Sequence, residues 1–243
     1  MSGPSRLETH QAADPGPDFR PDFRHVKNWV FDLDNTLYPA DCGLFAQVDA
    51  RMTDFVAEYL KLDRDAARAL QKSFYRQHGT TLNGLIQIHG MDPEPYLEFV
   101  HQIDLSDLHP DPALAEAIEK LPGRRYVFTN GCARHAARIL ARLGLEALFE
   151  QIWDIRSIAF VPKPDPAAYR HILAHGGFAP DAAAMFDDMP QNLAAAHALG
   201  MTTVWLNTDS AWRAEGPEIP VASASHIDHE IKDLTRFLGN IRI

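Results

Sequence analysis

Two aspartates that directly follow a short apolar segment are the residues of this sequence best suited to chemistry. The segment Trp29-Val30-Phe31 ends at Asp32, and Leu33 separates that residue from Asp34. A strand that enters a core has no structural use for two carboxylates. A nucleophile and a general acid or base, however, are both roles that a carboxylate can fill. The pair therefore predicts a reactive site at the end of the first strand.

Three more groups of polar residues follow apolar segments further along the chain. In chain order they are Thr129, Asn130 and Gly131 after residues 126–128, Lys163 in the segment VPKPDP, and Asp187 and Asp188 after residues 184–186. Clustered carboxylates repel one another unless a cation lies among them, and oxygen ligands without His or Cys suit Mg²⁺. A magnesium ion beside carboxylates, one lysine, a threonine and helix-start amides is typical of phosphoryl transfer.

The elements that must position these residues follow from periodicity and capping. Apolar residues recur every three or four positions over residues 44–60, which predicts an amphipathic helix. Further helices are expected from Asp63 to Gly79 and after the pairs Asp92-Pro93 and Asp111-Pro112, where a capping residue precedes a proline of the first turn. Residues 41–108 are thus expected to be helical throughout.

The rest of the chain alternates short apolar segments with helical ones. Strands are expected at 29–31, 126–128, 152–155, 184–186 and 202–206, helices at 132–143, 166–175 and 193–199, a loop at 207–224 and a terminal surface helix at 228–238. This alternation predicts an α/β fold with a doubly wound parallel sheet. Since ligands bind outside the carboxyl ends of such strands, all the polar groups above should meet at one edge.

Composition sets broader limits. With 23 Lys and Arg against 33 Asp and Glu, the net charge is −10, which argues against nucleic acid or an anionic membrane as partner. Two distant cysteines favour reduced thiols. The first 24 residues are polar and rich in proline, and we expect a flexible leader in which Phe19 or Phe23 packs onto the core. No apolar run has the length of a membrane span, so a cytoplasmic protein is expected.

The segments DLDNT, TNG, PKP and FDD occur in this order and resemble the four motifs of the haloacid dehalogenase superfamily. The resemblance implies a Rossmann-like core and an enzyme that forms an aspartyl-phosphate on Asp32, with Asp34 as general acid and then general base. It also implies that Thr129, assisted by Asn130 and the amides near Gly131, binds the phosphoryl group, and that Lys163 neutralises the nucleophile and phosphate oxygens.

The same resemblance implies how Mg²⁺ is held. Asp32, the backbone carbonyl of Asp34, and Asp188 correspond to direct ligands, whereas Asp187 corresponds to a residue that often acts through water. Asn192 occupies a position where many relatives carry another acid.

The helical block at residues 41–108, inserted after the first strand, resembles the subclass I cap of this superfamily. Core segments at 25–40 and 109–243 would then flank it. Several segments, among them VFDLDNTLYPAD, SFYRQHGTTLNGL and FVPKPDPAAY, are similar to the pyrimidine 5'-nucleotidase subfamily. The candidates for contacts to the leaving group are Tyr75, His78, Thr80, Thr81 and Asn83, although the threonines and Gly79 could equally serve a turn.

These observations predict a Mg²⁺-dependent phosphomonoesterase whose substrate is a pyrimidine nucleoside 5'-monophosphate or another small phosphorylated metabolite. No obligatory protein partner is evident. A phosphatase or phosphomutase acting on sugar phosphates would share every core residue, and a nucleotide-binding protein without turnover is the alternative from another class. A haloacid dehalogenase is disfavoured, because that chemistry needs no metal and relatives that perform it lack the second carboxylate.

Overall fold

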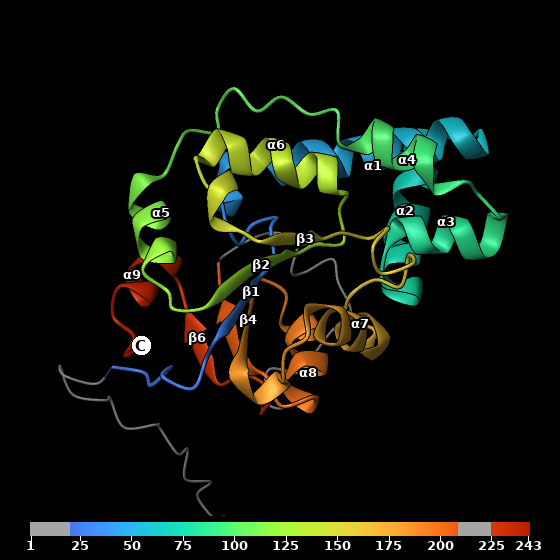
Figure 1. Ribbon diagram of the computed structural model, residues 1–243. Coiled ribbons are helices and arrows are strands. Elements are labelled where there is room, and N and C mark those ends of the chain that lie inside the picture. Colours follow the sequence, from blue (N-terminus) through green and yellow to red (C-terminus); the bar gives the residue numbers. More distant parts are fainter. Residues whose placement is uncertain (1–19, 209–224) are drawn as a thin grey trace, which may run out of the picture.

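The computed structural model describes residues 20–208 and 225–243, and its centre is a six-stranded parallel sheet (Figure 1). The strand order is β3-β2-β1-β4-β5-β6, and every neighbouring pair is parallel. The strands are β1 (Asn28–Phe31), β2 (Arg124–Phe128), β3 (Gln151–Trp153), β4 (Ala183–Asp187), β5 (Thr202–Leu206) and β6 (His229–Ile231). The predicted doubly wound α/β fold is confirmed.

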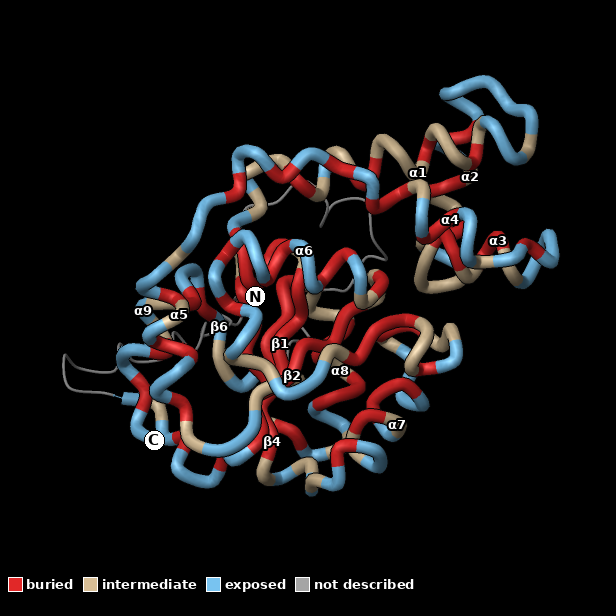
Figure 2. The backbone as a smooth tube through the Cα atoms, turned by 45° about the horizontal axis from the view of Figure 1, so that its top comes forward, coloured by how far each residue is buried: buried red, intermediate tan, exposed pale blue. Residues whose placement is uncertain are grey.

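Helices cover both faces of this sheet (Figure 1). The core helices are α5 (Pro112–Glu119), α6 (Ala133–Leu143), α7 (Pro166–Gly176), α8 (Pro190–Ala198) and α9 (Leu234–Leu238). Phe31 packs with the residues of α5, α6 and α9, whereas its neighbour Val30 packs with those of α7 and α8. Successive side chains of a strand point to opposite faces, so an apolar segment buries both. The central strands are accordingly buried along their length (Figure 2).

Five α-helices lie between β1 and β2, and we call the first four of them, which precede α5, the helical insertion. They are α1 (Leu44–Leu60), α2 (Arg64–His78), α3 (Thr81–His89) and α4 (Pro93–Val100). The Asp63 side chain accepts from the first free amides of α2, as the capping pattern predicts. Phe55 of α1 meets Tyr96 of α4 edge to face at 5.1 Å between ring centroids, which joins the first and last helices of the insertion.

Three sequence expectations are wrong in detail. The insertion is not helical to residue 108, because α4 ends at Val100 and the apolar residues that follow pack into the core as irregular chain. Residues 229–231 form β6, not part of a terminal helix. The leader cannot extend to residue 24, because Phe23 packs into the core, as one of the two alternatives predicts, and its amide donates to the Arg242 carbonyl.

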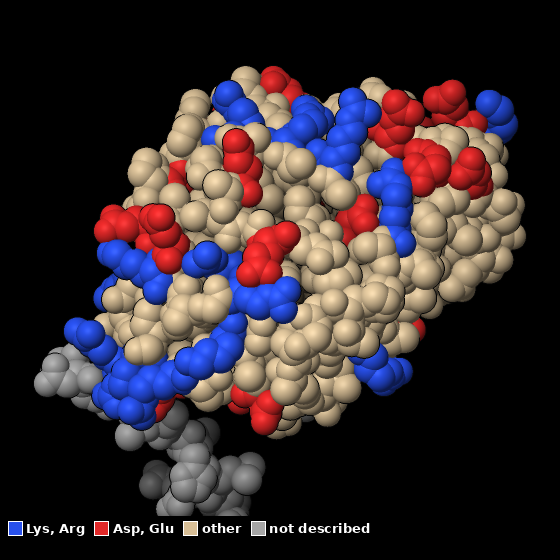
Figure 3. Space-filling model, viewed as in Figure 1, with Lys and Arg blue, Asp and Glu red and all other residues tan. Residues whose placement is uncertain are grey.

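Residues 1–19, which include Phe19, and most of the expected loop at 207–224 lie outside the described ranges. Within those ranges no helix combines the length and apolar character that crossing a membrane requires. Basic side chains gather toward the end of the core remote from the insertion, whereas acidic and basic side chains alternate over the insertion (Figure 3). The drawn face thus carries charges of both signs.

Candidate active site

The polar groups predicted from the sequence meet at the carboxyl edge of the three central strands. Asp32 follows β1, Thr129 follows β2, and Asp187 ends β4. Because β1 lies between β2 and β4, these side chains are brought together from segments that are far apart in the sequence. The Asp32 amide donates to the Phe186 carbonyl at 2.8 Å, which extends the ladder to the reactive residue and fixes its backbone.

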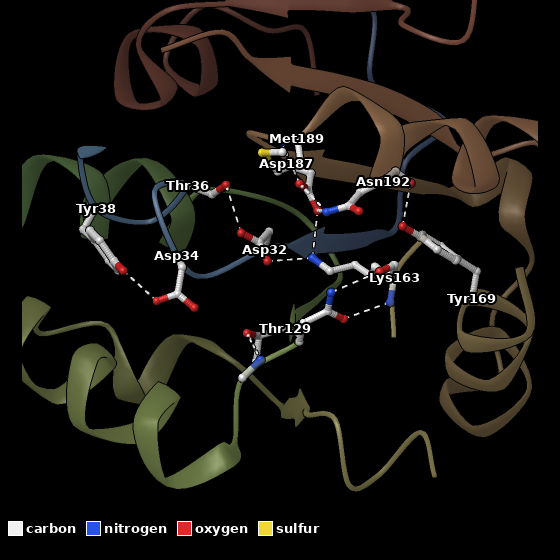
Figure 4. A network of polar contacts seen from close by, with 12 residues as sticks. Asp32, Asp34, Thr36, Tyr38, Thr129, Lys163, Tyr169, Asp187, Met189 and Asn192 are labelled. Carbon is white, nitrogen blue, oxygen red and sulfur yellow. Dashed lines mark hydrogen bonds and ion pairs between the residues drawn. The ribbon is translucent and has the colours of Figure 1, made fainter. Parts of the chain in front are cut away.

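Lys163 lies between two of the aspartates (Figure 4). Its Nζ donates to Asp32 Oδ1 at 2.6 Å and to Asp187 Oδ2 at 2.7 Å, and the residue is only 1% exposed. The loop that carries it is fixed by Asn130, whose side-chain oxygen accepts from the Lys163 amide at 2.8 Å and whose Nδ2 donates to the Lys163 carbonyl at 3.1 Å. The Asn130 side chain therefore positions the lysine.

One ammonium group cannot neutralise all the carboxylates around it. Burial raises the pKa of Asp32 to about 7, the Asp187 and Asp34 carboxylates add to this effect, and Lys163 opposes it. Burial would lower the pKa of Lys163, but Asp187 and Asp32 outweigh burial and raise it. The lysine thus stays charged, and the raised pKa values of Asp32 and Asp188 indicate that the acids favour a further proton or cation beside it.

Asp32, Asp187 and Asp188 could together hold a metal ion. One carboxylate oxygen from each lies within 4.8 Å of the other two. Asp187 is occupied, because its oxygens accept from Lys163, from the Met189 amide and from Asn192 Nδ2. Oδ2 of Asp188, by contrast, is buried without a hydrogen-bond partner among the described residues. A buried carboxylate oxygen of this kind requires a cation or a proton, so the residues fit Mg²⁺.

Asp34 lies apart from this group of three acids, and its side chain is held separately (Figure 4). Its Oδ1 accepts from the Tyr38 hydroxyl at 2.6 Å and from His135 Nε2 at 2.9 Å. Burial alone would raise the pKa of Asp34, but the charge and hydrogen bond of His135 and the Tyr38 hydrogen bond hold it below the usual range. The second aspartate of the motif therefore has its own environment, as a distinct chemical role requires.

Thr129 and Gly131 form a compact turn after β2. The Thr129 amide donates to the Trp153 carbonyl, and its Oγ1 accepts from the Gly131 amide at 2.9 Å. A Cβ at residue 131 would lie 3.2 Å from that hydroxyl oxygen and 3.4 Å from Nε2 of His101, which is tighter than usual packing. Glycine is needed here because the chain passes close to its neighbours.

A cavity of about 350 Å³ connects this edge of the sheet with the helical insertion. Of the residues predicted to contact a leaving group, Tyr75, Thr80 and Thr81 line it. His78 and Asn83 do not: His78 Nδ1 pairs with Gln87 Oε1, and Asn83 Nδ2 donates to the His78 carbonyl. Thr80 also caps α3, since its hydroxyl accepts from the Asn83 amide. Part of the candidate loop therefore stabilises the turn between α2 and α3.

The structure brings further residues to the site, beyond those of the four motifs. His135 is 1% exposed and contacts Asp34. His101 is buried against the His135 ring. On α2, residues 71, 72 and 76 also line the cavity beside Tyr75. Counted from residue 71, residues 72, 75 and 76 follow after one, four and five positions, which places all four on one face of a helix. This spacing could therefore have been recognised in the sequence.

Comparison with known proteins finds relatives whose names refer to phosphate metabolism or to a phosphatase. "Phosphate metabolism protein 8" of Saccharomyces cerevisiae is 31% identical over 192 residues, which are 72% of this chain and 60% of that protein. A "Phosphoglycolate phosphatase" of Haemophilus influenzae is 31% identical over 106 residues, 42% of this chain and 46% of that one. The chain thus spans about half to three fifths of the length of these two relatives. A "Glyceraldehyde 3-phosphate phosphatase" of Methanopyrus kandleri is 25% identical over 197 residues, 74% of this chain and 83% of its own.

Solved structures share the fold at low sequence identity. A protein described as a predicted phosphoglycolate phosphatase from Haemophilus somnus superposes with a TM-score of 0.60 at 20% identity, over 89% of this chain and 98% of its own. A magnesium-bound HAD-hydrolase from Bacillus subtilis gives a TM-score of 0.56 at 16% identity, over 90% and 99%. Residues 26–200, more than half of the sequence, match the family model for haloacid dehalogenase-like hydrolases. The chain therefore belongs to the haloacid dehalogenase-like hydrolases.

Proposed function

We propose that this protein is a Mg²⁺-dependent phosphatase that hydrolyses a small phosphate ester, a pyrimidine nucleoside 5'-monophosphate in particular, through an aspartyl-phosphate. The observation that carries the proposal is the pairing of two differently held aspartates: Asp32 in a buried group of acids with Lys163, and Asp34 on the side of the cavity. A phosphatase of this type needs a nucleophile and a separate proton donor, and the two environments supply them.

In the proposed reaction an oxygen of Asp32 attacks phosphorus, and the bond from phosphorus to the ester oxygen breaks. Asp34 takes up a proton as the negatively charged phosphate ester binds beside it, and it gives this proton to the departing oxygen. As a base it then takes a proton from the water that attacks the aspartyl-phosphate, so Asp32 and inorganic phosphate are released. Lys163 balances charge on Asp32 and the phosphoryl oxygens. Asp32, Asp188 and the Asp34 carbonyl would hold Mg²⁺, assisted by Asp187, and the ion would supply electrostatic stabilisation of the phosphoryl group.

The cavity supports a leaving group larger than a simple alcohol. Its volume of about 350 Å³ exceeds what a phosphoryl group occupies, and it extends from Asp34 to Tyr75 and Gln71 of α2. Pockets for small organic ligands begin at about 300 Å³ and combine aromatic walls with a few polar groups. The Tyr75 ring suits stacking on a pyrimidine base, whereas the Gln71 amide is already bonded to Asp49 and Thr53. The insertion would then act as a cap that determines substrate choice and excludes water.

The test is phosphate release from a panel of esters, with Mg²⁺ and with EDTA. The panel contains p-nitrophenyl phosphate, the four common nucleoside 5'-monophosphates, phosphoglycolate and glyceraldehyde 3-phosphate. We expect turnover only with Mg²⁺ and the highest kcat/KM for the pyrimidine nucleotides. Better turnover of phosphoglycolate or a sugar phosphate would refute the nucleotide assignment and leave the phosphatase assignment intact.

Two variants test the reaction itself. Asp32→Asn should abolish turnover of every ester, because an amide cannot form the acyl phosphate. Asp165→Asn is the matched control: Asp165 caps α7 from outside the cavity, and asparagine caps a helix equally well. If the Asp32→Asn protein hydrolysed p-nitrophenyl phosphate at the wild-type rate, the proposed function would be wrong.

A further inference from the structure

The carboxylate of Asp34 is held through only one of its two oxygens. Tyr38 and His135 both donate to Oδ1, at 2.6 Å and 2.9 Å. No residue in the ranges 20–208 and 225–243 donates to Oδ2, and Asp34 lines the cavity. In Figure 4 one Asp34 oxygen points toward Tyr38 and the other is turned away from it. Two donors on one oxygen fix both the position and the rotation of the carboxyl group.

The two donors are themselves fixed. Tyr38 is 2% exposed, and it lies in the segment that leaves β1 for the helical insertion. His135 is 1% exposed on α6, and its ring stacks on that of His101 with centroids 4.3 Å apart and planes at 21°. His101 follows α4, where the chain returns from the insertion, and its Nδ1 pairs with the Leu97 carbonyl at 2.9 Å. Both chain crossings between the core and the insertion thus contribute to the surroundings of Asp34.

From this geometry we infer that Tyr38 and His135 are positioning residues, which occupy Oδ1 of Asp34 so that Oδ2 carries the proton and presents it to the leaving oxygen. The inference rests on the proposed phosphatase function and adds to it. While the bond between phosphorus and the ester oxygen breaks, the proton moves from Oδ2 to that oxygen. In the second step Oδ2 takes a proton from the attacking water, so no oxidant or other co-reactant is needed.

The inference makes a prediction about leaving groups that a purely structural role would not make. An alkoxide leaves poorly without a proton, whereas p-nitrophenolate is stable as an anion and leaves without one. General acid catalysis contributes about 10²- to 10⁴-fold where it is needed. Loss of the positioning contacts should therefore lower kcat/KM for an alkyl phosphate far more than for p-nitrophenyl phosphate.

The experiment compares kcat/KM for p-nitrophenyl phosphate and uridine 5'-monophosphate, both with Mg²⁺, in Tyr38→Phe, His135→Phe and His135→Gln. In the two phenylalanine variants we expect the ratio of aryl to alkyl activity to rise at least about tenfold. His135→Gln retains an N–H donor at similar reach and should recover most of the wild-type ratio. Tyr126→Phe is the control, because it also removes a buried tyrosine hydroxyl, one that has no hydrogen-bond partner in the described ranges.

The outcomes separate the two hypotheses. If the wild-type protein hydrolyses neither ester, the proposed function fails. If it hydrolyses both and the ratio in Tyr38→Phe equals that of Tyr126→Phe, the positioning role is refuted while the phosphatase survives. Melting curves accompany the rates. Should His135→Phe fail to fold, Tyr38→Phe decides the question alone, because it removes one oxygen atom and leaves the ring in place.

Discussion

Magnesium should stabilise this protein against heat, and the stabilisation should depend steeply on pH. The reason lies in the group of buried acids Asp32, Asp187 and Asp188, of which the first two form ion pairs with the ammonium group of Lys163. Burial and the neighbouring carboxylates raise the pKa of Asp32 from 3.8 to about 7. The metal-free folded protein thus binds a proton at this group more tightly than the unfolded chain does. The stabilisation of the fold by this bound proton is complete below about pH 4 and is lost as the pH rises toward 7. The free energy of unfolding falls by about 1.4 kcal/mol per pH unit over this range, which gives a loss of about 4 kcal/mol.

A divalent cation replaces that proton, and the size of the effect follows from mass action. At pH 8 the carboxylate is ionised, and Mg²⁺ at one hundred times its dissociation constant stabilises the fold by about 2.7 kcal/mol. For a chain of this length that corresponds to a Tm increase of about 5–10 °C. At pH 5, about two pH units below the pKa, the ion must displace a proton and binds about a hundredfold more weakly. The same concentration then adds only about 0.4 kcal/mol, a shift of about 1 °C.

The measurement is thermal unfolding followed by circular dichroism at pH 5 and pH 8, with MgCl₂ or with EDTA and NaCl at equal ionic strength. Asp188→Asn removes the carboxylate whose Oδ2 has no hydrogen-bond partner among the described residues, so it should reduce the shift at pH 8 by more than half. Asp165→Asn, outside the cavity, should behave like the wild type. Equal magnesium shifts at the two pH values, or an unchanged shift in Asp188→Asn, would refute this account of the acidic group.

Three further substitutions test packing and charge. Lys163→Met leaves two buried carboxylates without their cation and should lower the free energy of unfolding by about 3–5 kcal/mol. The measurement is a urea titration at pH 8, and a loss below about 1 kcal/mol would contradict the ion-pair geometry. Gly84→Ala places a Cβ 2.4 Å from the Phe74 ring and should lower the free energy of unfolding by about 1–3 kcal/mol. An unchanged denaturation midpoint would show instead that the helical insertion repacks around the added methyl group. Phe23→Ala leaves a cavity at a fully buried position and should lower the free energy of unfolding by about 3–5 kcal/mol in the same titration. No change would indicate that residue 23 belongs to the flexible leader.

The fold could be predicted because the central strands β1 and β4 are buried along their whole length and their segments are mainly apolar. β6 has no such signal. It has only three residues, His229–Ile231, and only the last is buried, so its sequence does not distinguish it from the start of a helix. Irregular chain after α4 was mistaken for helix for a related reason. Ile103, Leu105 and Leu108 are buried in the core, and burial alone does not require helical periodicity.

The site could be predicted where topology alone brings residues together. In a parallel sheet the residues after each strand must lie at one edge, so Asp32, Thr129 and Asp187 required no knowledge of side-chain packing. The contact of His135 with Asp34 is different, because 101 positions separate the two residues and the histidine belongs to a helix that could have turned it outward. Only the packing of α6 against the segment after α4 decides its direction.

Hydrogen-bond donors, more than sequence position, distinguish the two adjacent aspartates after β4. Lys163, the Met189 amide and Asn192 saturate Asp187, so it is held by the protein and has little capacity left for a cation. Asp188 receives no such donors on Oδ2 from the described residues. Because Asn192 is an amide, it can donate to Asp187, which an ionised acid at this position could not do. Residue 192 therefore helps to assign Asp187 to the lysine and leaves Asp188 as the carboxylate whose buried Oδ2 is available for a metal ion or a proton.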